Sequence, residues 1–136
     1  MYTKSVLTLT EARTILEAAR SKALEQQWNV VITIVDDGGH LLVLERMDDT
    51  QLGSIQVSQE KARTALLFRR PSKMLEDTIL DGRVHMLALP GATPVEGGLP
   101  LLVAGRLVGA IGVSGVKSSE DGQVAQAGAD FAATLV

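Results

Sequence analysis

The stretch GGLPLLVAGRLVGAIGVSG, residues 97–115, decides how the rest of the chain is interpreted. Its apolar residues predict two strands, Leu101–Ala104 and Leu107–Ser114, joined by a tight turn at Gly105-Arg106. The same stretch holds six of the thirteen glycines of the chain, although glycine weakens a strand by about 0.5–1 kcal/mol relative to alanine. A hairpin so rich in glycine indicates that something approaches its backbone closely.

Three of these glycines occur at intervals of three residues. Gly109, Gly112 and Gly115 therefore alternate between the two faces of a strand and cannot all serve one contact. We expect one face to admit helices with small residues closely, and the other to face a neighbouring subunit or a ligand. The pair Gly97-Gly98 comes before the first strand, where bare backbone N–H groups could meet a ligand.

The segments around this hairpin predict a single domain, residues 1–136, of the α/β (α+β) class. A capping box at Thr8–Glu11 starts an amphipathic helix over 9–27. The other expected elements are a hairpin (Val30–Val35 and Leu41–Met47), a helix from Ser54 to the residue before Pro71, a helix over Ser72–Leu80 and a final helix after Ser118. Arg83–Pro100 is irregular, with a further strand expected at Val84–Leu89. This order suits an antiparallel sheet of about five strands flanked by helices.

Composition excludes several functional classes. The formal net charge is −3 with interspersed charges, so there is no basic stripe for nucleic acid. The absence of cysteine excludes disulfides and thiolate metal sites. No apolar run approaches 18 residues and no leader pattern opens the chain, so we expect a cytoplasmic protein that does not span a membrane. Hydrophobic residues make up 46% of the chain, and most of them are aliphatic. So much aliphatic surface in a small domain favours a homo-oligomer, in which another subunit covers part of it.

Four blocks of sequence resemble a known family. They are VDDGGHLLVLERMD (35–48), QEKARTALLF (59–68), residues 97–115 and SEDGQVAQAGADF (119–131). Together they resemble the GlcG/HbpS family, also called haem-degrading, which includes the C-terminal domain of PduO-type cobalamin adenosyltransferases. The resemblance implies a profilin/PAS-like sandwich that assembles into dimers, tetramers or octamers. It also implies haem or iron binding in some members, and a role beside catabolic enzymes in others. One of the haem-binding relatives uses a histidine on the first helix, whereas residues 9–27 contain none.

The residues themselves suggest one pocket per subunit, lined by Lys61, His85, Gly97 and Gly98 with Arg46 at its rim. Lys61 is either a half-buried cation facing the glycine loop or a surface lysine. His85 is the candidate metal ligand, as an axial ligand of haem. Arg46 either pairs with a nearby acid or anchors a substrate carboxylate. The expected occupant is an anionic small molecule, or haem bound through its propionates.

Three functions remain in competition at this point. The first is an oligomeric ligand-binding accessory protein of the GlcG/HbpS type, with haem or another tetrapyrrole as a candidate ligand. The second is an enzyme that acts on a small anionic catabolic intermediate, with Lys61 and Arg46 holding the anion and His85 as acid or base. The third is a structural partner of a neighbouring enzyme complex.

Overall fold

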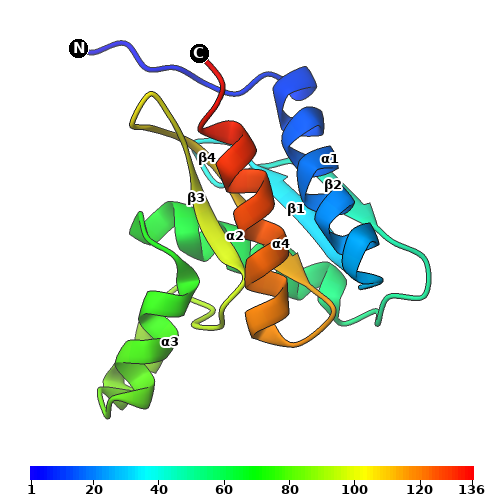
Figure 1. Ribbon diagram of the computed structural model, residues 1–136. Helices are drawn as coiled ribbons and strands as arrows, with labels where there is room; N and C mark the ends of the chain where they lie inside the picture. Colours follow the sequence, from blue (N-terminus) through cyan, green and yellow to red (C-terminus); the bar gives the residue numbers. More distant parts are fainter.

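The computed structural model describes all residues, 1–136, as a four-stranded antiparallel sheet with helices on both faces (Figure 1). The elements are α1 (Leu9–Gln26), β1 (Val31–Val35), β2 (Leu41–Arg46), α2 (Ser54–Phe68), α3 (Ser72–Leu80), the 3₁₀-helix η1 (Val84–Ala88), β3 (Gly98–Val103), β4 (Arg106–Ser114) and α4 (Ser118–Ala132). The strand order is β2-β1-β4-β3, so both predicted hairpins form and their inner strands pair in the centre. None of the helices has the length and apolar character needed to cross a membrane.

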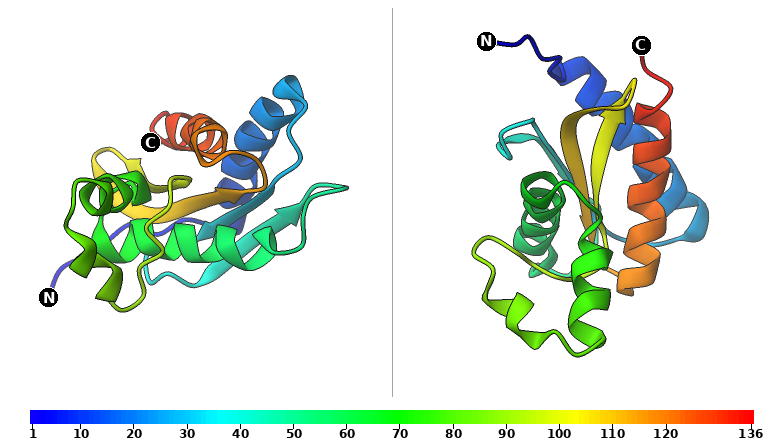
Figure 2. Two further views of the ribbon diagram at one scale, coloured as in Figure 1. Left: turned by 90° about the horizontal axis from the view of Figure 1, so that it is seen from below. Right: turned by 90° about the vertical axis from the view of Figure 1, so that its left-hand side faces the viewer.

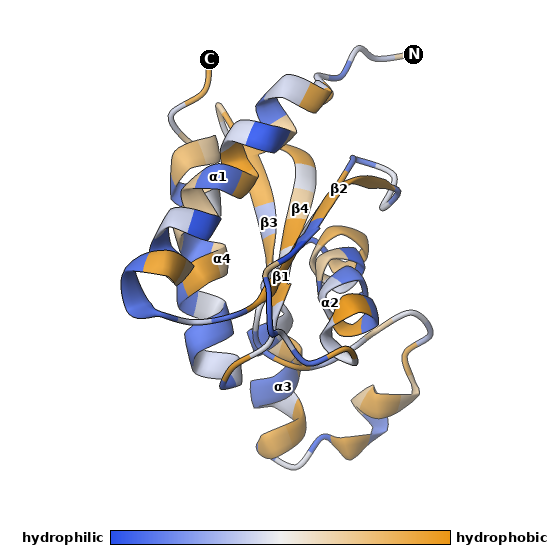
Figure 3. Cartoon of the chain, turned by 90° about the vertical axis from the view of Figure 1, so that its right-hand side faces the viewer, coloured by the Kyte–Doolittle hydropathy of each residue, from blue (hydrophilic) through white to orange (hydrophobic).

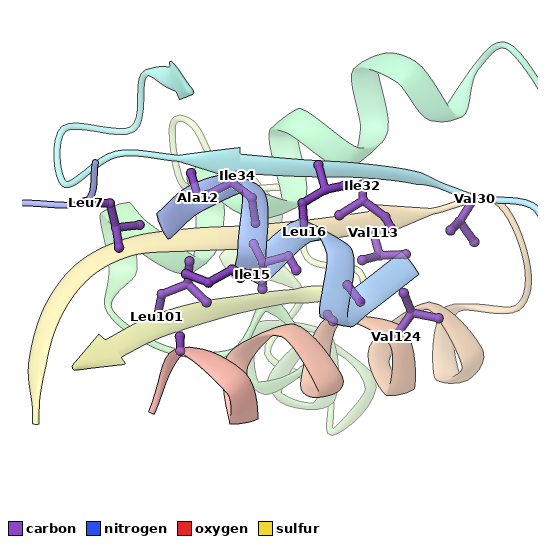
Figure 4. Packing of buried hydrophobic residues seen from close by; sticks show 14 of the residues in the cluster. Leu7, Ala12, Ile15, Leu16, Val30, Ile32, Ile34, Leu101, Val113 and Val124 are labelled. Atoms are coloured by element: carbon purple, nitrogen blue, oxygen red, sulfur yellow. The ribbon is translucent and has the colours of Figure 1, made fainter. Parts of the chain in front are cut away.

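The main hydrophobic core lies between the sheet and the helices α1 and α4 (Figure 4). Ile15 of α1 and Val124 of α4 meet Ile32 of β1 and Ile111 of β4 there, and all four are fully buried. Helix α2 covers the opposite face of the sheet, as the right-hand view of Figure 2 shows. The sheet is therefore the middle layer of three.

The capping box predicted at the start of the first helix and the turn predicted for the first hairpin both form. The hydroxyl of Thr8 accepts a hydrogen bond from the Glu11 N–H at 3.2 Å, and the Glu11 carboxylate accepts one from the Thr8 N–H at 2.8 Å. Asp36 closes the first hairpin turn, because its Oδ1 accepts from the N–H groups of Gly38 and His40 at 2.8 and 2.9 Å. These are the side-chain contacts by which caps and turns of this kind are stabilised.

The prediction of a fifth strand at Val84–Leu89 is wrong. Residues Val84–Ala88 form the 3₁₀-helix η1, so the sheet has four strands instead of about five. A short apolar run cannot be assigned to helix or strand from periodicity alone. The outer edge of β3 is also a poor template, since the Gly98 N–H is donated to the Ser72 hydroxyl at 2.9 Å and Pro100 has no N–H.

The glycines of the second hairpin bring α2 into direct contact with the sheet. Gly98 of β3 and Gly112 of β4 are paired in register, and both face α2. A Cβ at Gly112 would overlap the carbonyl oxygen of Ser58 and lie 2.6 Å from the amide nitrogen of Ala62. A Cβ at Gly98 would lie 2.7 Å from the carbonyl carbon of Lys61. The close approach expected on one face is therefore made by α2.

The other face of β4 is covered by the chain itself. A Cβ at Gly109 would lie 3.0 Å from a methyl group of Leu7, which belongs to the main core. The second turn also differs by one residue from the prediction: Ala104 and Gly105 have positive φ (51° and 76°), and Arg106 already begins β4. The two positive φ values are those of the type I′ turns that suit hairpins.

Helix α3 and η1 project away from the three layers, as Figures 1 and 2 show. Only Ser72 and Leu75 of α3 are buried, and no residue of η1 is. Large apolar side chains on this projection are exposed, with exposed fractions of 52% at Met74, 76% at Leu80, 62% at Val84 and 62% at Leu87 (Figure 3).

Candidate functional site

A groove runs along the outer edge of β3, between α4 and the start of α3. It consists of two adjoining hollows of about 200 and 450 Å³, which share Pro71, Leu99 and Gln126. We call it the β3 groove. Its lining residues are Arg69, Pro71, Lys73, Glu96, Gly97, Gly98, Leu99, Pro100, Leu102, Gly122, Gln126, Ala129, Asp130 and Ala133.

Ser72 fixes the backbone at the narrow end of the groove. Its side chain is fully buried, and its hydroxyl donates to the Val95 carbonyl at 2.6 Å while accepting from the Gly98 N–H at 2.9 Å. These bonds tie the first turn of α3 to the segment that enters β3. Gly97, at φ 133°, has no side chain to fill the space. The narrow end is therefore walled partly by bare backbone.

The narrow end carries opposite charges. Lys73 forms an ion pair with Asp77 at 2.8 Å, and the hydrogen bond from Lys73 to that carboxylate raises the pKa of Lys73. Glu96 lies beside Gly122 of α4, where a Cβ would come within 2.5 Å of the Glu96 carboxylate. Burial raises the pKa of Glu96, and the nearby acids add to this while Lys73 opposes it. Glu96 is thus more easily protonated than an ordinary glutamate.

The wider end of the groove is apolar along its floor. Leu99, Pro100 and Leu102 come from β3, and Ala129 comes from α4. Arg69, which follows α2, stands at this end. An apolar surface with ionisable groups at its ends can bind an amphipathic small molecule and orient it by its charge.

Lys61 lies behind the groove and is a buried ion-pair partner. Its side chain is 2% exposed, and its ammonium donates to the Val113 carbonyl at 3.0 Å and to Asp121 Oδ2 at 3.1 Å. Burial raises the pKa of Asp121, although Lys61 and the Val116 N–H, which hydrogen bond to the carboxylate, oppose that effect. The pair joins α2, β4 and the first turn of α4. The Lys61 amine also lies 2.9 Å from the position that a Cβ on Gly97 would take.

The structure brings together only part of the residue set predicted from the sequence. Gly97 and Gly98 line the β3 groove, and Lys61 supports them from behind. His85 is exposed on η1 and lines neither hollow of the groove. Arg46 ends β2, at the opposite edge of the sheet, and lines a different hollow beside α1.

These positions bear on the chemistry that a single chain can perform. The enzymatic alternative needs Lys61, Arg46 and His85 around one substrate, and one chain does not bring them together. No group of three or more histidine, aspartate or glutamate side chains is arranged to hold a metal ion.

Sequence reasoning missed all five polar side chains of the groove: Arg69, Lys73, Glu96, Gln126 and Asp130. Lys73 looked like one of several cations near a helix end, and Glu96 stands directly before the glycine pair. Gln126 is an exposed residue of α4 that lies within the block 119–131, but that block did not mark it as a site residue. Only the position of Glu96 before Gly97 offered a clue.

Comparisons with known proteins identify the family. The model of the family described as "Haem degrading protein HbpS-like" matches residues 7–130. Protein GlcG of Escherichia coli is 45% identical over 114 residues, which cover 84% of this chain and 85% of GlcG. Among solved structures, Klebsiella pneumoniae protein ORFY has a TM-score of 0.90 at 27% identity, covering 100% of this chain and 97% of that one.

A further solved structure has a haem ligand in its name. The PduOC:haem complex has a TM-score of 0.83 at 28% identity, covering 93% of this chain and 94% of that chain. The family matches and the fold agree with the resemblance carried by the four sequence blocks. The chain belongs to the HbpS-like family, which includes GlcG.

Proposed function

We propose that this protein is an oligomeric ligand-binding accessory protein that holds a small amphipathic anion in the β3 groove. The observation that carries the proposal is the continuous groove, with its apolar floor over Leu99 and Ala129. Each end carries one cation and one carboxylate, namely Lys73 with Glu96 and Arg69 with Asp130. An apolar body would lie on the floor and an acidic group would meet a cation. Lys61 serves the site by supporting Gly97 from behind.

Haem is one candidate ligand, supported by the haem complex of the PduOC relative. The groove accepts a flat apolar molecule with acidic groups, but its lining includes no histidine, cysteine, methionine or tyrosine to serve as an axial ligand. We keep His85 as the proposed axial ligand. Because it stands on exposed η1, outside the groove of its own chain, it would meet haem held by a neighbouring copy.

The exposed apolar surface supports assembly. Leu80, Val84 and Leu87 stand on a projection that its own chain leaves uncovered. Burying apolar surface yields roughly 25 cal/mol per Å², so a second copy that covers these side chains would be stabilised.

The test is an absorbance titration with haemin of four proteins: the natural chain, Gln126→Trp, Gln123→Trp and His85→Ala. Gln126 and Gln123 are both exposed residues of α4, but only Gln126 lines the groove. We expect a Soret shift in the natural chain and in Gln123→Trp, and binding at least tenfold weaker in Gln126→Trp. The His85→Ala variant is expected to bind with an altered Soret position, since the iron loses its proposed ligand.

Each outcome decides a separate part of the proposal. No Soret shift in the natural chain removes haem as a ligand. Equal affinities of the two tryptophan variants place the binding site outside the groove, and an unchanged Soret band in His85→Ala removes the histidine from coordination. Circular dichroism melting of each variant confirms that the fold is intact before binding is compared.

A further inference from the structure

Another hollow, distinct from those described above, lies at the end of the sheet where β3 and β4 are joined. Its volume is about 520 Å³, and Tyr2, Lys4, Ser5, Asp37, Arg69 and Arg106 are among the residues that line it. Figure 1 shows the N-terminal segment running past this end of the molecule. The segment, the β1–β2 turn, the end of α2 and the start of β4 thus meet around one space.

The hollow carries an excess of positive charge. Three cations, Lys4, Arg69 and Arg106, stand against one carboxylate, Asp37. Lys4 already pairs with Asp37 at 2.5 Å, and the hydrogen bond to that carboxylate raises the pKa of Lys4. Neither Arg69 nor Arg106 has an ion-pair partner in the structure. The two guanidinium groups are therefore free to meet an anion.

Arg69 occupies an unusual backbone position. It is the C-cap of α2, with φ 53° and ψ 41°, and its N–H points back to the carbonyls of Ala65 and Leu66. Glycine is the common residue at such a left-handed cap, and a side chain there strains the backbone. The chain places a long cation at this fixed point, facing the hollow.

We propose that this hollow is a binding site for a small oxyanion, that is, a phosphate group or a carboxylate. A guanidinium group donates two parallel hydrogen bonds to either oxyanion. The hydroxyls of Tyr2 and Ser5 on the rim supply further donors. Arg69 lines both this hollow and the wide end of the β3 groove, whereas Arg106 lines only this hollow, so Arg106 is the residue that distinguishes the two sites.

The experiment is an NMR titration of the full chain with inorganic phosphate, and separately with acetate, at constant ionic strength against a chloride reference. We expect saturable shifts of the amides of Arg69 and Arg106 and of the N-terminal segment. The anion that saturates at the lower concentration identifies the preferred source. Arg106→Gln should weaken binding at least tenfold. The matched control, Arg83→Gln, removes another exposed arginine that has no ion pair and should bind as the natural chain does.

Three results would overturn the inference. One is a linear shift without saturation for both anions, which indicates only general screening. Another is equal weakening by Arg106→Gln and Arg83→Gln. The third is unchanged binding in Arg106→Gln. If Arg106→Gln melts early, Arg69→Asn provides the second variant, since asparagine tolerates the left-handed cap. A failure here leaves the haemin result untouched, because neither tryptophan variant alters this hollow.

Discussion

Replacing Gly112 with alanine tests the packing on which the whole molecule is built. The new methyl group would overlap the carbonyl oxygen of Ser58 and lie 2.6 Å from the Ala62 nitrogen, where ordinary contact begins near 3.4 Å. Both atoms belong to the backbone of α2, so no side-chain rotation relieves the overlap. The helix must rise from the sheet, or β4 must bend away from it.

Either movement stretches buried hydrogen bonds that join α2 to the sheet. The hydroxyls of Ser58 and Thr33 are 2.8 Å apart, and Lys61 Nζ is 3.0 Å from the Val113 carbonyl oxygen. Overpacking costs about 1–3 kcal/mol, and a buried polar group left without a partner costs about 1–3 kcal/mol more. We therefore expect Gly112→Ala to lower the free energy of unfolding by about 2–6 kcal/mol.

The assay is urea unfolding followed by circular dichroism, with Gly53→Ala as the matched control. Gly53 is open, with nothing within 4 Å of a Cβ, and its φ of −57° and ψ of −27° suit alanine. That control should be neutral or stabilising by about 0.4–1 kcal/mol. A loss below about 1 kcal/mol in Gly112→Ala would show that α2 does not rest on the glycine pair as argued.

Two more predictions follow from the buried ion pair and from the exposed projection. Lys61→Met leaves the Asp121 carboxylate buried without its cation, so we expect a loss of about 3–5 kcal/mol in urea unfolding, largely recovered in the double variant with Asp121→Leu. The pKa of Asp121, already raised by burial, rises further without the lysine. The loss of unfolding free energy in Lys61→Met should therefore shrink as the pH falls toward about 4, because the carboxyl group becomes neutral. Losses that simply add in the double variant, or a loss that does not change with pH, would contradict this coupling. Light scattering at micromolar concentration should show an oligomer, and Leu87→Glu should reduce its mass, since Leu87 is 62% exposed in the single chain; a monomeric natural chain would refute the assembly.

Elements whose causes are local could be predicted from the sequence. Thr8 and Glu11 satisfy each other's backbone donors within one turn, and Asp36 closes its own turn, so neither needs the rest of the fold. The prediction of a strand at Val84–Leu89 was wrong because the conformation of this short segment depends on tertiary contacts and not on its own sequence. At the outer edge of β3, the Gly98 N–H that could pair with a further strand is already donated to Ser72.

The glycines show where prediction from spacing stops. Intervals of three residues indicated that Gly109 and Gly112 face opposite sides, and the structure confirms it. The spacing did not indicate that Gly98 stands directly opposite Gly112 and shares its contact with α2. Register between strands depends on turn geometry and burial together, and here the turn begins one residue earlier than the sequence suggests.

The candidate site was harder to predict because the strand order separates residues that look related by type. Arg46 ends β2 and Gly98 begins β3, and these strands occupy opposite edges in the order β2-β1-β4-β3. Three interstrand spacings of about 4.8 Å put them roughly 14 Å apart across the sheet. Arg46 therefore belongs to the hollow beside α1. The groove is instead lined by residues near the β3 edge, which come from β3, the segment before it, the end of α2, the start of α3 and helix α4.

The partner of Lys61 was hidden for a related reason. Asp121 lies 60 residues away in sequence, in the first turn of α4, where an acidic residue is already expected from the helix dipole alone. Its local role concealed its tertiary role. Because the side chains of Lys61 and Asp121 are each 2% exposed, Lys61 lies next to Gly97 from within the core. In the proposed site, contact with a ligand would be left to Lys73 and Arg69. A ligand in the groove would thus rest on glycine backbone that this buried charge pair holds in place.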